Sequence, residues 1–106
     1  MSNLLFVCSR NQWRSPTAEK IYKEKGFSAR SAGTSPKAKH SISVKDVEWA
    51  DVIFVMEKKH KNRVVAMFGR LVEYKKIHVL DVPDEYRFMD PLLIDHLEDV
   101  MEPYLD

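Results

Sequence analysis

Two side chains that can do chemistry together lie near the start of the chain, where Arg14 follows Cys8 at a distance of six residues. A cysteine thiolate is a strong nucleophile, and the arginine guanidinium is a planar group of donors that can bind two oxygens of a phosphate. Cys8 is the only cysteine of the chain, so it cannot form an internal disulfide. This pair predicts a site in which a sulfur nucleophile faces an oxyanion.

The residues around this pair predict a loop that leads from a strand into a helix. Leu4–Cys8 is a short apolar run, typical of a strand buried on both faces. Ser15 is a favoured N-cap and Pro16 a favoured first helical residue, with Glu19 in the first turn. The unpaired N–H groups of such a helix start bind anions and favour a thiolate. We therefore expect phosphate binding by Ser9, Arg10, Asn11, Gln12, Trp13 and Arg14.

The rest of the chain alternates between apolar runs and amphipathic segments. We expect further strands at residues 27–32, 51–56 and 77–82, and helices at 44–50, at 57–68 and after Asp90-Pro91. The charged run 57–63 is interpreted as a solvated helix face, and no histidine is assigned a role. This order predicts an α/β fold, a single three-layer domain over residues 1–106 with a four-stranded parallel sheet flanked by helices. Binding sites in such folds lie at the carboxyl ends of the strands, where Cys8 falls.

Composition excludes several classes of function. The net charge of +1 gives no global attraction to nucleic acid or to an anionic membrane. The longest apolar run is too short to span a bilayer, and the N-terminus lacks the pattern of a signal peptide. No His, Cys and carboxylate set has metal-ligand spacing. These features predict a soluble, cytoplasmic protein.

Residues 7–19, VCSRNQWRSPTAE, resemble the signature of the low-molecular-weight protein tyrosine phosphatases. That signature is Cys, five residues, Arg, Ser and then Pro-x-Ala-Glu. Residues 31–34 resemble the exit of that family's second strand, residues 49–56 its third strand, and Asp90-Pro91 its late Asp-Pro pair. The resemblance thus extends in order over most of the chain, and it implies the fold of this family and no cofactor.

The resemblance also implies a mechanism. Cys8 would attack phosphorus and form a phosphocysteine, while Arg14 and the loop N–H groups stabilise the equatorial oxygens. Ser15 would hydrogen-bond the sulfur, and Asn11, in a left-handed conformation, would bond toward Ser15 and Ser31. The substrate would be a phosphorylated protein or a small phosphomonoester, with phosphotyrosine favoured. No metal would be needed, and the protein would act as a monomer.

The general acid of this mechanism stays open between two aspartates. Asp90 matches the Asp-Pro pair and is preferred, but Asp84 stands in Val82-Pro83-Asp84, a context that often precedes the pair. Asp81 is a third, weaker candidate. If neither Asp90 nor Asp84 reaches the loop, turnover should be poor.

The sequence also departs from the family pattern in ways that keep rival functions open. Arg10 stands where a glycine is usual, and Trp13 stands where many members carry a second cysteine. One rival is a phosphate-binding module without turnover. The other is a single-thiol arsenate reductase, which would need an external small thiol because this chain has no second cysteine.

Overall fold

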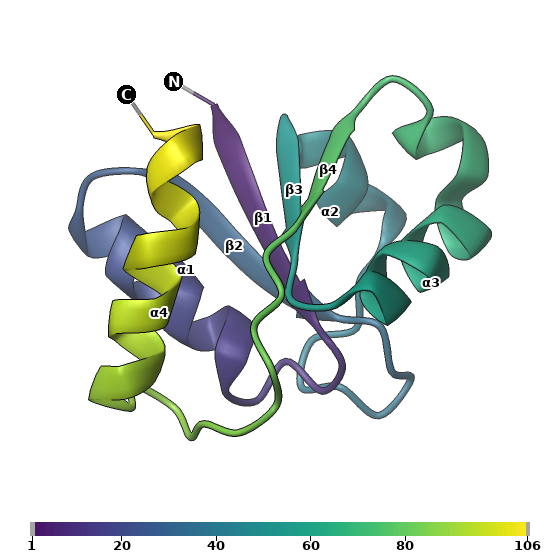
Figure 1. Ribbon diagram of the computed structural model, residues 1–106. Helices are drawn as coiled ribbons and strands as arrows, with labels where there is room; N and C mark the ends of the chain where they lie inside the picture. The colour runs from purple at the N-terminus through teal and green to yellow at the C-terminus, as the bar shows by residue number, and fades with distance from the viewer. Residues whose placement is uncertain (1, 106) are drawn as a thin grey trace.

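The computed structural model describes residues 2–105 (Figure 1). Its strands are β1 (Asn3–Cys8), β2 (Ser28–Gly33), β3 (Val52–Val55) and β4 (Lys76–Val79). Its helices are α1 (Arg14–Glu24), α2 (Val44–Trp49), α3 (Lys58–Phe68) and α4 (Pro91–Met101), with short 3-10 turns at η1 (Gly69–Val72) and η2 (Glu102–Tyr104). Within these residues, no helix has the length and apolar character needed to cross a bilayer.

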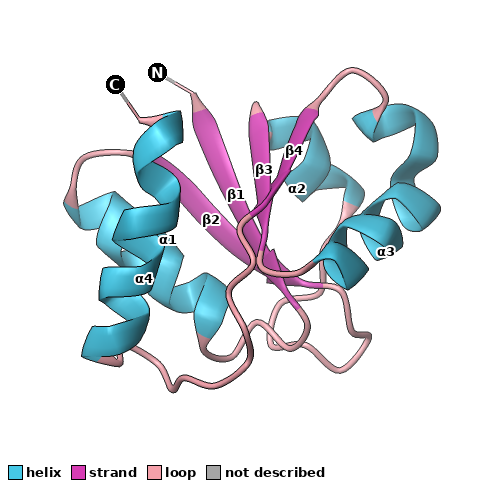
Figure 2. Cartoon of the chain, in the orientation of Figure 1, coloured by secondary structure: helices cyan, strands magenta, loops and turns pink. Residues whose placement is uncertain are grey.

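The four strands form one parallel sheet in the order β2-β1-β3-β4. Helices α1 and α4 cover one face of this sheet, and α2 and α3 cover the other (Figure 2). The predicted fold class is therefore confirmed. From β1 the chain leads to β2 on one side, and it then crosses back to β3 on the other side of β1. The strand order therefore reverses beside β1. The carboxyl end of β1, where Cys8 lies, is at this reversal, the usual place for a binding site in an open α/β sheet.

The side chains of β1 point alternately into the two cores, which explains why this strand is apolar along its length. Leu4, Phe6 and Cys8 pack in the core shared with α1 and α4, whereas Leu5 and Val7 pack in the core on the opposite face. Successive side chains of a strand point to opposite faces, so a strand covered on both sides must be apolar at every position. Cys8 thereby points its sulfur toward the α1 layer.

Two expected boundaries are wrong. Helix α1 begins at Arg14 after an N-cap residue, Trp13, whose side chain makes no capping bond. Ser15 therefore lies inside the helix and is not its N-cap, and Glu19 lies beyond the first turn in which it was expected. Strand β4 ends at Val79, three residues earlier than expected, and Asp81 beyond it has a left-handed backbone with φ 57°.

Candidate active site

The loop between β1 and α1, residues 8–14, is held in place from outside by the segment that follows β2. The backbone N–H groups of Thr34, Ser35 and Lys39 donate to the carbonyl oxygens of Cys8, Ser9 and Arg10 at 2.9, 2.9 and 3.0 Å. The contact is close, because a Cβ added at Gly33 would lie 2.5 Å from the Ser9 carbonyl oxygen and 2.6 Å from the Ala38 Cβ. A glycine is therefore required where β2 passes under this loop.

These three bonds also fix the direction of the loop's N–H groups. In a trans peptide, the C=O of one residue and the N–H of the next point in opposite directions, and none of the described peptide bonds is cis. Because the carbonyls of residues 8–10 accept from the segment 34–39, the N–H groups of Ser9, Arg10 and Asn11 are turned away from that segment. Backbone donors turned to the opposite side of the loop are suited to binding an anion.

A chain of hydrogen bonds ends at the Cys8 sulfur. Asn11, with φ 53°, donates through Nδ2 to Ser15 Oγ and to Ser31 Oγ, both at 2.9 Å. Ser31 Oγ in turn donates to Glu19 Oε1. Since Ser15 Oγ accepts from Asn11, its own hydrogen can be donated to Cys8 Sγ, which lies 3.0 Å away. The bonds that the resemblance implied for Asn11 and Ser15 are present in the structure, and Glu19 is an addition to them.

Arg14 is held on the other side of the loop by residues that follow β3 and β4. The side chain is 3% exposed, and its Nη1 donates to Glu57 Oε2 at 2.5 Å and to the Val82 carbonyl oxygen at 2.8 Å. Burial raises the pKa of Glu57, but the hydrogen bond and the charge of Arg14 outweigh it and hold that pKa below its ordinary value. Both contacts use Nη1, so the other nitrogens of the guanidinium group can donate to a ligand.

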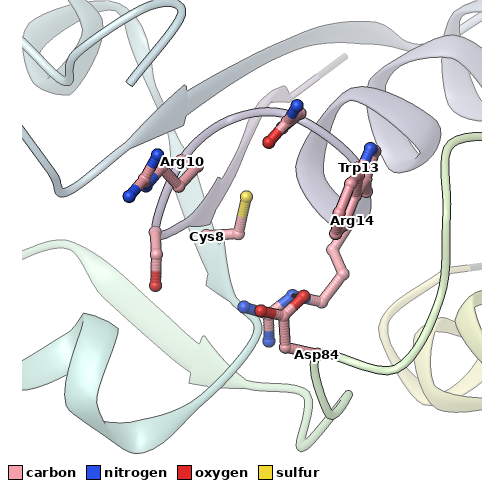
Figure 3. A pocket seen from close by; sticks show the side chains of 7 residues that line it. Cys8, Arg10, Trp13, Arg14 and Asp84 are labelled. Carbon is pink, nitrogen blue, oxygen red and sulfur yellow. Dashed lines mark ion pairs between the residues drawn. The ribbon is translucent and has the colours of Figure 1, made fainter. Parts of the chain in front are cut away.

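The loop and its neighbours enclose a small cavity of about 40 Å³. Figure 3 shows the sulfur of Cys8 beneath the arc of the loop, with Arg10 on one side and Trp13 and Arg14 on the other. Asp84 comes from the segment after β4 and closes the cavity next to Arg14, with its Oδ1 3.7 Å from Arg14 Nε. The lining residues are Cys8, Ser9, Arg10, Gln12, Trp13, Arg14 and Asp84.

The two aspartates that the sequence left open therefore differ in position. Asp90 is the N-cap of α4, where its carboxylate accepts from the Leu92 N–H at 2.9 Å, and it is not among the residues that line the cavity. Asp81 lies at a separate surface hollow with Pro83 and Glu57. The carboxylate of Asp90 is thus held at the start of α4, whereas that of Asp84 lies beside Arg14 at the cavity, a position that favours Asp84 over the preferred Asp90.

The segment that carries Asp84 is anchored to α1 through a buried threonine. Thr17 Oγ1 donates to the Trp13 carbonyl oxygen at 2.6 Å and accepts from the Met89 N–H at 2.9 Å. Met89 has φ 60°, an uncommon conformation for such a side chain. These bonds connect the acidic segment 83–90 to the end of the loop between β1 and α1.

Sequence reasoning missed three residues that shape this site: Thr17, Glu57 and His60. Glu57 and His60 belong to the charged run that was interpreted as solvated, yet His60 is 1% exposed and its Nε2 lies 2.8 Å from Ser9 Oγ. For Glu57 and His60, the only signal in the sequence was their position directly after a predicted buried strand, at the sheet edge where Cys8 also lies. No group of three or more His, Cys, Asp or Glu side chains within residues 2–105 is arranged to hold a metal ion.

The fold is that of the low-molecular-weight phosphatases. The tyrosine phosphatase Wzb from Escherichia coli K30, solved with phosphate, matches with a TM-score of 0.77 and 18% identity over 98% of this chain and 96% of that one. A low-molecular-weight protein tyrosine phosphatase from T. tengcongensis matches with a TM-score of 0.68 and 24% identity, over 96% and 94%. The expected structural resemblance is thus confirmed across nearly the full chain.

A second kind of phosphatase shares this fold. A mutant of the arginine phosphatase YwlE, which carries a phosphorylated active-site serine, matches with a TM-score of 0.70 and 22% identity over 96% of this chain and 92% of that one. No protein-family model and no curated protein matches the sequence. The chain is therefore similar in fold to phosphatases that act on two different phosphorylated side chains.

Proposed function

We propose that the protein is a phosphatase that hydrolyses phosphomonoesters through a phosphocysteine formed on Cys8. The observation that carries this proposal is the shared cavity, in which the Cys8 sulfur, the Arg14 guanidinium and the Asp84 carboxylate lie around loop N–H groups turned the same way. The fold it shares with Wzb and YwlE supports the same class of reaction.

In the first step, the Cys8 thiolate attacks phosphorus and an S–P bond forms as the bond from phosphorus to the leaving oxygen breaks. Arg14 and the N–H groups of the loop stabilise the negative charge on the equatorial oxygens. Asp84 donates its proton to the leaving oxygen, so the alcohol departs neutral.

In the second step, Asp84 takes a proton from a water molecule, whose oxygen attacks phosphorus. The S–P bond breaks, inorganic phosphate is released and the electron pair returns to the Cys8 sulfur. The Ser15 hydroxyl, 3.0 Å from that sulfur, stabilises the departing thiolate. No step needs a second thiol, so the absence of another cysteine in the chain is compatible with this reaction.

The substrate we propose is phosphotyrosine in a protein, with phosphoarginine as the second candidate because the arginine phosphatase YwlE has the same fold. Two features of the cavity rim favour tyrosine. Trp13 supplies an aromatic surface beside the loop, and Arg10 adds a positive charge that would repel a cationic guanidinium leaving group. The proposal includes one domain over residues 1–106, acting as a monomer in the cytoplasm.

The first test is hydrolysis of p-nitrophenyl phosphate by the wild type and by Cys8→Ser in the presence of a chelator. We expect turnover by the wild type, loss of turnover in Cys8→Ser, and inhibition by phosphate and vanadate. Wild-type protein that binds phosphate but hydrolyses none would support the binding module. Reduction of arsenate with an external thiol such as glutathione, in place of hydrolysis, would support the reductase.

A further inference from the structure

His60 is a buried titratable side chain that the proposed mechanism does not use. It lies in the first turn of α3 and is 1% exposed. Its Nδ1 lies 3.0 Å from the backbone N of Glu57, and its Nε2 lies 2.8 Å from Ser9 Oγ. Both ring nitrogens therefore have a partner, and one of these partners adjoins the phosphate-binding loop.

The partners decide which nitrogen carries the proton. A backbone N–H can only donate, so Nδ1 must accept and must be unprotonated. In a neutral imidazole the hydrogen is then on Nε2, which donates it to Ser9 Oγ. Burial and the nearby charge of Arg14 lower the pKa of His60 to about 4, which agrees with a neutral ring.

This donation leaves the hydrogen of the Ser9 hydroxyl for another acceptor. Ser9 lines the cavity together with Cys8 and Arg14 and is half-buried. In the part of the chain that the structure describes, no protein acceptor takes up this hydrogen; the only side-chain bond of Ser9 Oγ is the one to His60. A donor of this kind at a cavity lined by Arg14 is suited to an oxygen of a bound anion.

We infer that the Ser9 hydroxyl is an additional donor to the phosphoryl group, and that His60 is the positioning residue that orients it. Backbone N–H groups and Arg14 supply the other donors, so Ser9 adds a side-chain contact whose direction is set from α3. The inference rests on the proposed function, because it needs a phosphoryl group in this cavity.

The test is the dissociation constant of tungstate and of inorganic phosphate, measured by calorimetry without turnover. We expect Ser9→Ala to weaken both about tenfold, the usual effect of losing a hydrogen bond to a charged group. Ser9→Thr, which keeps the hydroxyl, should bind nearly as well as the wild type. Ser28→Ala, at the start of β2 and far from the loop, is the matched control and should change nothing.

A double-mutant cycle distinguishes positioning by His60 from a general structural role. We expect His60→Met to weaken anion binding as Ser9→Ala does, and to have no further effect in the Ser9→Ala background. His60→Gln, which can still accept from Glu57 and donate to Ser9, should recover part of the affinity. Additive losses in the cycle would overturn the role assigned to His60.

The proton assignment has its own test, which needs no variant. The ¹⁵N resonances of His60 at pH 7 should be those of a neutral ring protonated at Nε2, and protonation at Nδ1 would overturn the inference. The proposed function is tested separately, since a wild type that binds neither anion contradicts that function. If the wild type binds but Ser9→Ala binds equally well, only the role of Ser9 is lost.

Discussion

The Cys8 sulfur depends on side chains from several parts of the chain for its hydrogen-bonding environment. Ser15 contacts it directly, Asn11 orients Ser15, and Ser31 with Glu19 completes the series on β2 and α1. Because the Asn11 amide donates to both serines, each serine hydroxyl is left with its hydrogen to donate onward. The Ser31 hydrogen goes to Glu19, and the Ser15 hydrogen is available to the Cys8 sulfur at 3.0 Å or to the Ala32 carbonyl oxygen at 3.4 Å.

The role of Asp84 is tested by comparing Asp84→Asn with Asp90→Asn on two substrates. p-Nitrophenolate leaves with little help from an acid, so both variants should still release it quickly in the first step, although Asp84→Asn should then hydrolyse the phosphocysteine slowly because it lacks the base. On phenyl phosphate, whose leaving group must be protonated, we expect kcat of Asp84→Asn to fall about a hundredfold. Asp90→Asn should lose little, because asparagine also caps helices well.

The opposite pattern would mean that Asp90 is the general acid. If Asp90→Asn fails on phenyl phosphate and Asp84→Asn does not, the position of Asp84 at the cavity has no catalytic meaning. Thermal unfolding of both variants controls for a loss of fold.

The contact between Glu57 and Arg14 leads to a second prediction. Glu57→Gln removes the charge that holds Arg14 Nη1, so the guanidinium should sample other positions. We expect phosphate affinity and kcat/KM each to fall roughly tenfold, the size typical of a hydrogen bond between charged groups. Glu73→Gln, at an exposed position after η1, is the control and should leave both unchanged. Unchanged affinity in Glu57→Gln would mean that the Val82 carbonyl alone is enough to position Arg14.

Residue types and spacing predicted that Cys8 and Arg14 share one loop, but not which side chains from other elements meet them there. Cys8 and Arg14 are separated by a fixed loop, so their proximity follows from local sequence. Asp84, Glu57 and His60 reach the loop only because β3 lies beside β1 in the sheet and β4 lies beside β3. Asp90 was preferred on its Asp-Pro pair, a pattern that a helix N-cap produces equally well.

At the scale of elements, the segment after β2 supports the loop between β1 and α1. It contributes three backbone bonds to that loop, and its contact is close enough to exclude a side chain at residue 33. The shape of the loop therefore depends on β2 as much as on the two elements that it joins.

Gly33→Ala should disturb this support. The added Cβ would meet backbone atoms of the loop, which cannot move aside as a flexible side chain can. We expect a loss of stability of about 1 to 3 kcal/mol together with weaker phosphate binding. The stability is measured by denaturant unfolding and the binding by calorimetry.

Gly26→Ala is the informative control for this variant. Gly26 has φ +94° but open space around it, so alanine there should destabilise the fold by about 1 kcal/mol through backbone strain alone. Phosphate affinity should not change. If the two variants weaken binding equally, the effect of Gly33→Ala is one of general stability rather than of the loop.

The elements themselves were largely predictable, and the exceptions have physical causes. Strands β1 and β3 are buried on both faces and so appear as apolar runs, and the Asp90 cap marks the start of α4. The error at Ser15 arose because Ser-Pro is a common helix start, whereas here the serine bonds to Cys8 inside the first turn. In α3, Val65 and Met67 are about half exposed while His60 is buried, because the His60 ring lies against Ser9 of the loop.

At the scale of the whole molecule, the burial of His60 makes the stability depend on pH. Burial and Arg14 lower its pKa in the folded state from 6.5 to about 4, Glu57 and Asp84 oppose this shift, and Lys59 adds to it. The unfolded chain therefore binds the proton more tightly than the folded one. The contribution is present above pH 6.5 and is lost as the pH falls toward 4.

We expect the free energy of unfolding to fall by roughly 2 kcal/mol from this residue between pH 6.5 and pH 4.5. His60→Gln should flatten that part of the pH profile, measured by urea unfolding. The pKa of His78 is also lowered, mainly by burial, so a smaller slope should remain. His96→Gln on α4 is the control, and an unchanged slope in His60→Gln would contradict neutral burial of this ring.

The three carbonyl bonds from the segment 34–39 have a consequence for how the protein attracts its ligand. The net charge of the molecule is only +1, so long-range attraction of anions is weak. The loop instead carries its polarity in oriented peptide groups and in the guanidinium group of Arg14. The protein should therefore select an oxyanion on contact with these donors rather than by attraction from a distance.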